Sequence, residues 1–101
     1  MATLHIVRQS AFNSNDFAQC IEMVCDNDVI ALLDDGCYNV QHTLMNNFQS
    51  NISQNKNIQI NILADHARAR AISVDESHFT KISMSNLVSM TFSNDRVITW
   101  Q

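Results

Sequence analysis

Apolar and polar residues along the chain form short segments of two kinds. Alternating or continuous apolar residues predict strands, whereas apolar residues three or four positions apart predict helices. The predicted strands are 3–7, 29–33, 58–62, 79–82 and 97–100. The predicted helices are 16 to about 26–28, 40–48, 63–72 and one that begins after Ser83. Strand and helix alternate about four times, which predicts an α/β fold with a mainly parallel sheet of four to five strands and helices on both faces.

The second predicted strand is apolar at every position from Val29 to Leu33. A short run of this kind is typical of a central strand that is covered on both sides. The Asp34-Asp35-Gly36 turn that follows contains the only glycine of the chain. The polar stretches 49–57 and 73–77 predict loops. Ser83 is the expected N-cap of the last helix because its hydroxyl can accept a hydrogen bond from the first helical turn.

The chain is long enough for one small domain and leaves little room for a second core. It has 101 residues, no proline, one glycine and 46% hydrophobic residues. We therefore expect a single three-layer α/β/α domain over residues 1–101. Folding at this size leaves modest stability, so contact with partner proteins would help.

The charge and the hydrophobic runs exclude several classes of function. The net charge of −4 provides no positive field for tRNA, DNA or an anionic membrane surface. The longest apolar run, Val29 to Leu33, is too short to span a bilayer, and no basic region followed by an apolar segment marks a signal peptide. We expect a cytoplasmic protein with no direct nucleic-acid or membrane partner.

Three cysteines form an odd set without metal-ligand spacing, which predicts reduced thiols. Cys20 and Cys25 lie in the first predicted helix, where burial is expected. Cys37 follows the predicted central strand, and a helix N-terminus there would lower its pKa, while Asp34 and Asp35 would oppose thiolate formation. Cys37 is therefore a candidate sulfur carrier. The favoured alternative for Cys37 is a thiol packed in a tight turn.

The other signals of common enzymes are missing from the sequence. The four histidines, at positions 5, 42, 66 and 78, lie on separate predicted elements without metal-binding spacing, so neither a metal nor a cofactor is expected. A single glycine cannot build a phosphate-binding loop, and there is no Gly-x-Ser-x-Gly elbow. The crevice at residues 34–38, at the carboxyl end of a central strand, is the best place for a ligand.

Several short motifs occur in the order and spacing of one bacterial family. They are Leu4-His5-Ile6, Leu32-Leu33-Asp34-Asp35-Gly36, Ala69-Arg70-Ala71, Leu87-Val88 with Thr91, and Trp100. Over nearly its whole length the chain resembles the TusB/DsrH family, and the family-motif positions are His5, Asp35, Gly36, Arg70 and Trp100. Cys20 falls where DsrH-type members carry a cysteine in the first helix.

Two residues depart from the pattern of the family. Ile6 stands where the family often has Thr, and Ala71 stands where it has Gly. The second departure bears on the end of the third helix, since a left-handed helix cap tolerates Ala less readily than Gly.

The resemblance implies a DsrEFH-like fold and an accessory subunit of a heterohexamer that passes persulfide sulfur between cysteines. Its partners would be TusC/TusD-like or DsrF/DsrE-like subunits and a downstream sulfur-carrier protein. In the TusBCD branch, which is the more widespread, sulfur reaches 2-thiouridine at the wobble position of tRNA. In the DsrEFH branch it serves the oxidation of stored sulfur. Since the principal sulfur-accepting cysteine lies on the TusD/DsrE-type subunit, this chain would be non-catalytic.

Two alternatives stay open. In the first, the chain is itself a sulfur carrier through Cys20 or Cys37. In the second, which lies outside the family, it is a homo-oligomeric regulatory domain that binds a small ligand at residues 34–38.

Overall fold

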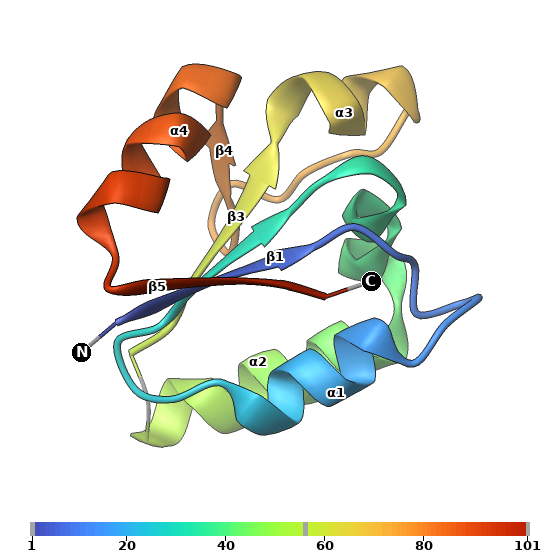
Figure 1. Ribbon diagram of the computed structural model, residues 1–101. Helices are drawn as coiled ribbons and strands as arrows, with labels where there is room; N and C mark the ends of the chain where they lie inside the picture. Colours follow the sequence, from blue (N-terminus) through green and yellow to red (C-terminus); the bar gives the residue numbers. More distant parts are fainter. Residues whose placement is uncertain (1, 56, 101) are drawn as a thin grey trace.

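The strands of the protein form one sheet, shown in Figure 1 by a computed structural model that describes residues 2–55 and 57–100. All four strand pairings among these residues are parallel. The order across the sheet is β4-β3-β2-β1-β5, so β2 is the central strand, as predicted. The strands are β1 (Thr3–Val7), β2 (Val29–Leu32), β3 (Gln59–Leu63), β4 (Thr80–Ile82) and β5 (Arg96–Trp100).

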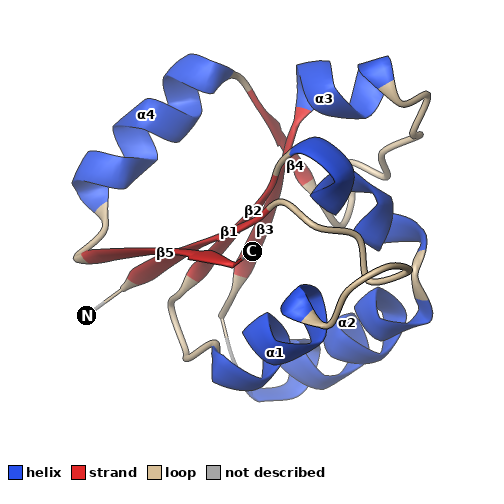
Figure 2. Cartoon of the chain, turned by 45° about the vertical axis from the view of Figure 1, so that its right-hand side comes forward, coloured by secondary structure: helices blue, strands red, loops and turns tan. Residues whose placement is uncertain are grey.

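Helices cover both faces of this sheet, and the predicted α/β fold with a parallel sheet is confirmed. They are α1 (Asp16–Met23), the 3₁₀ helix η1 (Asp34–Gln41), α2 (Thr43–Asn55), α3 (Ala64–Ala69) and α4 (Met84–Ser93). Figure 2 shows α1 and α2 side by side on one face and α4 on the other. η1 and α3 directly follow the carboxyl ends of β2 and β3. No helix within residues 2–55 and 57–100 is long and apolar enough to cross a membrane.

Successive side chains of a strand point to opposite faces of the sheet, so the apolar side chains are divided between two cores. Ile30 and Leu32 of the central strand pack on the side of α1 and α2, together with Phe17 and Met45. Ala31 of the same strand packs on the side of α4, in a smaller cluster that contains Leu4, Ile6, Leu33, Leu63, Ile82 and Leu87. Burial on both faces explains why every position of β2 is apolar.

The prediction for residues 40–57 was wrong in two respects. η1 occupies residues up to Gln41, and α2 begins only at Thr43, after an extended His42 (φ −89°, ψ 146°). α2 then continues to Asn55 through most of the stretch predicted as a loop, while Lys56 lies outside the described residues. Asn and Gln lower helix propensity only slightly, and the buried Met45 and Phe48 fix this helix by packing.

The ends of the other helices follow local hydrogen bonding. Ser83 is the N-cap of α4, as predicted, and forms a capping box in which its hydroxyl accepts from the Asn86 N–H at 3.2 Å. α3 ends at Ala69 and not at Ile72 as predicted, because Ala71 is left-handed, with φ 53°. α1 ends at Met23 and not at residues 26–28 as predicted.

Candidate functional site

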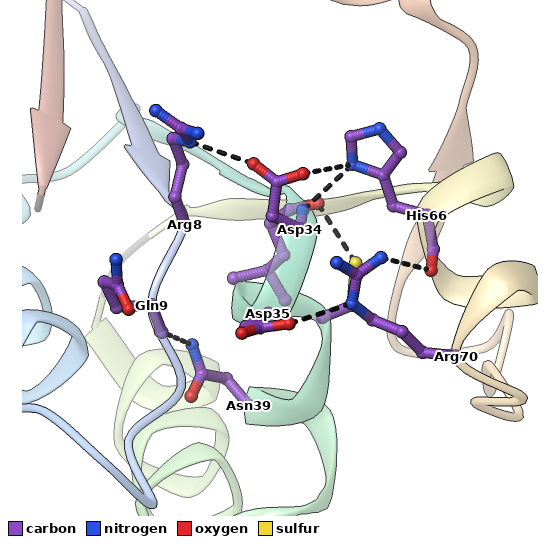
Figure 3. Close-up of polar contacts among 9 residues, drawn as sticks. Arg8, Gln9, Asp34, Asp35, Asn39, His66 and Arg70 are labelled. Carbon is purple, nitrogen blue, oxygen red and sulfur yellow. Dashed lines mark hydrogen bonds and ion pairs between the residues drawn. The ribbon is translucent and has the colours of Figure 1, made fainter.

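A cluster of charged side chains lies at the carboxyl edge of the sheet (Figure 3). Arg8 follows β1, Asp34 and Asp35 begin η1 after β2, and His66 and Arg70 come from α3 and its C-cap after β3. The carboxyl ends of parallel strands meet at one edge, so residues far apart in the sequence converge there. This is the edge at which the crevice of residues 34–38 is predicted.

Asp34 is the centre of this cluster and lies between Arg8 and His66 in Figure 3. Its carboxylate accepts a hydrogen bond from Arg8 Nε at 2.9 Å, and its backbone N–H donates to His66 Nδ1 at 2.9 Å. A nitrogen that accepts a hydrogen bond carries no proton, which places the ring proton of His66 on Nε2. His66 Nδ1 also lies 3.5 Å from the Asp34 carboxylate, and 28% of the His66 side chain is exposed.

Asp35 and Arg70, two of the family-motif positions, form an ion pair that joins η1 to α3. Arg70 Nε donates to Asp35 Oδ1 at 3.0 Å, and Arg70 Nη1 donates to the carbonyl of His66 at 3.2 Å. The hydrogen bond with Asp35 raises the pKa of Arg70. Both side chains therefore act as a brace between two elements of the carboxyl edge.

Gly36 is required by a close approach between η1 and β1. A Cβ at this position would overlap the carbonyl oxygen of Val7, and the Gly36 N–H donates to the carbonyl of Arg8 at 3.1 Å. Its φ is not positive, so the absence of a side chain decides the residue type here. Nearby, the buried Asn39 holds the segment after β1 by accepting from the Ala11 N–H at 2.7 Å and donating to the carbonyl of Gln9 at 3.1 Å.

Cys37 is packed beneath this cluster and has no exposed surface. Its thiol lies 3.6 Å from the carbonyl oxygen of Leu32. Burial raises the pKa of Cys37 to about 11. The charge of Arg70 lowers this pKa, but by less than burial raises it, and the charges of Asp34 and Asp35 raise it further. The first turn of η1 therefore does not produce a thiolate here, and the geometry is that of a packed thiol.

The two cysteines near α1 differ in exposure. Cys20 is fully buried, and burial together with the charge of Asp28 raises its pKa to about 12. Cys25, for which we expected burial, is exposed. That expectation was wrong because α1 ends at Met23 and Val24 is extended, with ψ 142°, which takes Cys25 out of the helical row.

A second polar group is buried between β1, β5 and the segment before β2. His5 Nδ1 accepts a hydrogen bond from Trp100 Nε1 at 3.1 Å, and His5 Nε2 lies 2.9 Å from Asp28 Oδ2. His5 and Asp28 are only 2% and 4% exposed. The ring proton of His5 is then on Nε2, where it is donated to Asp28. His5 and Trp100, the first and last family-motif positions, thus connect the two neighbouring strands.

Asp28 is the anchor of this buried group. Burial would raise its pKa, but hydrogen bonds from the Cys25 N–H, from His5 and from the Thr3 N–H outweigh that effect and lower it. The two backbone donors lie 2.9 Å and 3.0 Å from its carboxylate oxygens. The carboxylate is therefore fully used inside the fold and is not a catalytic acid.

The sequence pattern identified some residues of these groups and missed others. Asp34, Asp35 and Cys37 were expected at the carboxyl edge and do lie together there. The partners Arg8, His66, Asn39 and Asp28 were not selected. A histidine within an apolar strand needs a hydrogen-bond partner, so the position of His5 was a signal, not used in the sequence analysis, for a buried acceptor near it.

The carboxyl-edge cluster offers paired charges to a polar or protein partner, and it contains no exposed thiol. Within the described part of the chain, no three His, Cys, Asp or Glu side chains are placed to hold a metal ion. A shallow pocket of about 400 Å³ lies beside α3 and does not include residues 34–38. It is lined by Ala64, Ala67, Arg68, Ala71, Ile72, Ser73, Val74 and Lys81.

The chain was compared with curated proteins, with solved structures and with family models. No curated protein matches the sequence. In fold the chain is similar to the crystal structure of the ychN protein from E. coli, with a TM-score of 0.70 and 16% sequence identity. The match covers 99% of this chain and 100% of that one. The family model described as "DsrH like protein" matches residues 9–97. The chain therefore belongs to the DsrH-like family.

Proposed function

We propose that this chain is an accessory, non-catalytic subunit of a sulfur-relay complex. Membership of the DsrH-like family supports a part in sulfur relay. The observation that carries the non-catalytic role is that Cys20 and Cys37, the two candidate sulfur carriers, are both fully buried. A sulfur carrier reacts as an exposed thiolate, whereas burial raises the pKa of both thiols well above the ordinary value.

The complex that we propose is a heterohexamer with TusC/TusD-like subunits, in the cytoplasm. Its persulfide sulfur would pass through a downstream sulfur-carrier protein to the wobble uridine of tRNA. The net charge of −4 supports a role without direct RNA contact. In the alternative branch the partners are DsrF/DsrE-like and the sulfur comes from stored sulfur. Both branches assign the same structural role to this chain.

The ion pairs at the carboxyl edge support such a role. The Arg8–Asp34 and Arg70–Asp35 pairs are partly exposed, and each joins two segments of the edge. Paired charges at the rim of a surface favour orientation and specificity of a protein contact more than affinity. We infer that these pairs face a partner subunit.

The proposal is tested by expressing the chain together with TusC- and TusD-like proteins and analysing the purified material by native mass spectrometry. We expect a heterohexamer. Persulfide transfer through the complex should be retained when Cys20 and Cys37 are both changed to alanine. The triple variant that also carries Cys25→Ala is the matched control for the exposed thiol.

Two outcomes would contradict the proposal. If no complex forms and the chain elutes alone, the subunit role is wrong. If the chain gains the mass of one sulfur atom and the alanine variants stop transfer, the chain is itself a carrier. Loss of transfer in the double variant assigns the carrier role to Cys20 or Cys37, whereas loss only in the triple variant assigns it to Cys25.

A further inference from the structure

The apolar arc of α4 is wider than the face that this helix buries. Leu87 is buried against the sheet, whereas Met84 is 50% exposed, Val88 is 50% exposed and Phe92 is 85% exposed. Residues four apart lie in one row along a helix, so these three side chains form a continuous ridge. We call this ridge the α4 stripe. It is the most exposed row of large apolar side chains on any single helix among the described residues.

The rest of the exposed surface of α4 is polar without being charged. Ser85, Asn86, Ser89 and Ser93 occupy it, and no Asp, Glu, Lys or Arg occurs between Met84 and Ser93. Solvated helices usually carry charges on their outer face, whereas the centre of a protein interface is depleted of charge and enriched in Phe and Met. The composition of α4 is thus that of a helix covered by another protein surface.

The order of side chains in the stripe makes it complementary to itself. Val88 lies in the middle, with Met84 one turn before it and Phe92 one turn after it. Around a two-fold axis at Val88, each Met84 therefore meets the Phe92 of the other copy, a contact in which the sulfur and the aromatic ring attract each other. Ridges four residues apart also pack into one another in the commonest class of helix crossing.

The absence of charged residues on α4 supports a second copy of this chain as the partner that binds the α4 stripe. In an isologous contact every charged residue near the axis meets its own copy, which costs free energy through repulsion. α4 has no charged residue to repel. A partner with a different sequence would not need this restriction, because opposite charges on the two sides could attract.

We propose that the α4 stripe docks on the α4 stripe of a second copy of the chain, around a two-fold axis near Val88. Val97 extends the surface, since it pairs with Leu4 on the face of the sheet that bears α4 and is 41% exposed. In Figure 1, α4 leads directly into β5. Four side chains per copy supply only part of the roughly 1,200 Å² that a stable interface buries, so the dimer is weak, with a Kd above about 1 μM.

The test uses the purified full chain and two variants of opposite charge, Val88→Glu and Val88→Lys. Sedimentation velocity at protein concentrations from about 5 μM to 1 mM should show a monomer–dimer equilibrium for the unaltered chain. Each variant alone should dimerise at least about tenfold more weakly, because like charges meet at the axis. An equal mixture of the two variants should recover dimerisation, since Glu then meets Lys.

Phe12→Ser is the matched control. Phe12 is also an exposed aromatic residue, 61% exposed, but it lies after β1 and packs against His42, away from α4. Its replacement should leave the monomer–dimer equilibrium unchanged. Circular dichroism of each variant shows whether it is folded.

The proposal is overturned if the unaltered chain stays monomeric up to 1 mM, or if the mixture dimerises no better than either variant alone. If Val88→Glu instead prevents assembly with TusC- and TusD-like subunits while the chain alone is monomeric, the stripe contacts a different subunit and self-docking is wrong. The inference does not rest on the proposed function, so its failure would leave the subunit role untouched.

Discussion

Ala71 adopts a backbone conformation that residues with a Cβ rarely take. Its φ of 53° places it in the left-handed region directly after α3. The Ile72 N–H donates to the carbonyl of Ala67 at 2.9 Å, and the Ala71 N–H donates to that of Arg68 at 3.1 Å. These two bonds form a Schellman motif, whose left-handed position is usually glycine. The departure at Ala71 seen in the sequence therefore corresponds to a strained cap that is otherwise complete.

We predict that Ala71→Gly stabilises the protein. Removing the Cβ relieves the left-handed strain, which outweighs the extra freedom of glycine in the unfolded chain, and should raise the free energy of unfolding by about 1 kcal/mol. Urea denaturation measures the difference. Ala69→Gly, at the last residue of the same helix, is the control and should lower stability by up to about 1 kcal/mol. Equal effects of the two substitutions would show that no strain is stored at Ala71.

Thiol reactivity should separate the three cysteines. In the folded protein we expect Ellman's reagent to modify Cys25 at once, because it is exposed. Cys20 and Cys37 should react at least about 100-fold more slowly, since the chain must open before reagent reaches them. Loss of the fast phase in a Cys25→Ser variant confirms the assignment. Two or more fast thiols in the unaltered chain would show that a buried cysteine is accessible.

At the scale of elements, β5 pairs with a single neighbouring strand in the part of the chain that the structure describes. Its main-chain partner is β1. At the end of β5, the side chain of Trp100 donates a hydrogen bond to the buried His5 of β1. Four of the five residues of β5 are exposed. The Trp100 side chain is therefore a contact that attaches β5 to the sheet in addition to its main-chain pairing with β1.

We expect Trp100→Phe to loosen β5. Phenylalanine cannot donate to His5 Nδ1, and a buried nitrogen without its partner costs about 1–3 kcal/mol. Urea denaturation should show this loss, and amide hydrogen exchange should be faster in residues 96–100. Ile98→Val, a small change on an exposed residue of the same strand, is the control and should alter stability by less than about 0.5 kcal/mol. If both variants behave alike, the indole hydrogen bond contributes nothing measurable.

The strands were predicted better than the helices, for a physical reason. Each strand has apolar residues at neighbouring or alternate positions, and both cores of the sheet use that pattern. α2 was only partly predicted because its outer face is made of Asn, Gln and Ser, which resemble a loop in composition. η1 was missed because a 3₁₀ helix has no apolar period of its own.

The candidate site was predicted in its position but not in its contacts. The turn after β2 marked the carboxyl edge because the fold class implies where strands end. The pairs that Asp34 and Asp35 form with Arg8, His66 and Arg70 depend on tertiary approach, which sequence spacing does not encode. The exposure of Cys25 likewise depended on where α1 ends, and element boundaries are the least predictable feature of a sequence.

At the scale of the whole molecule, the buried thiols predict how stability depends on pH. Burial raises the pKa of Cys20 to about 12 and that of Cys37 to about 11, from an ordinary 9.0. Above pH 9 the unfolded chain loses these protons before the folded one does. The two thiols therefore contribute full stability below pH 9, and this contribution is lost as the pH rises toward the folded values.

The expected loss is roughly 1–2 kcal/mol per thiol by a pH of about 10.5. Urea denaturation at several pH values between about 8 and 10.5 measures it. Cys37→Ala should flatten the dependence, although it also removes packing, so the slope and not the absolute stability is compared. Cys25→Ala, at the exposed thiol, should leave the slope as it was. An unchanged slope in Cys37→Ala would show that this thiol ionises equally in both states.

The pairing of the first strand with the last has a consequence for how the protein is made. His5 and Trp100 are 95 residues apart, and β1 has β5 as its outer neighbour. On the ribosome, β1 emerges before the other four strands. One of its edges then stays unpaired, and His5 lacks its indole donor, until residues 96–100 have left the exit tunnel. A nascent chain stalled before that point presents an open strand edge, which favours aggregation and chaperone binding. Pairing along this edge of β1 is thus delayed until β5 is available.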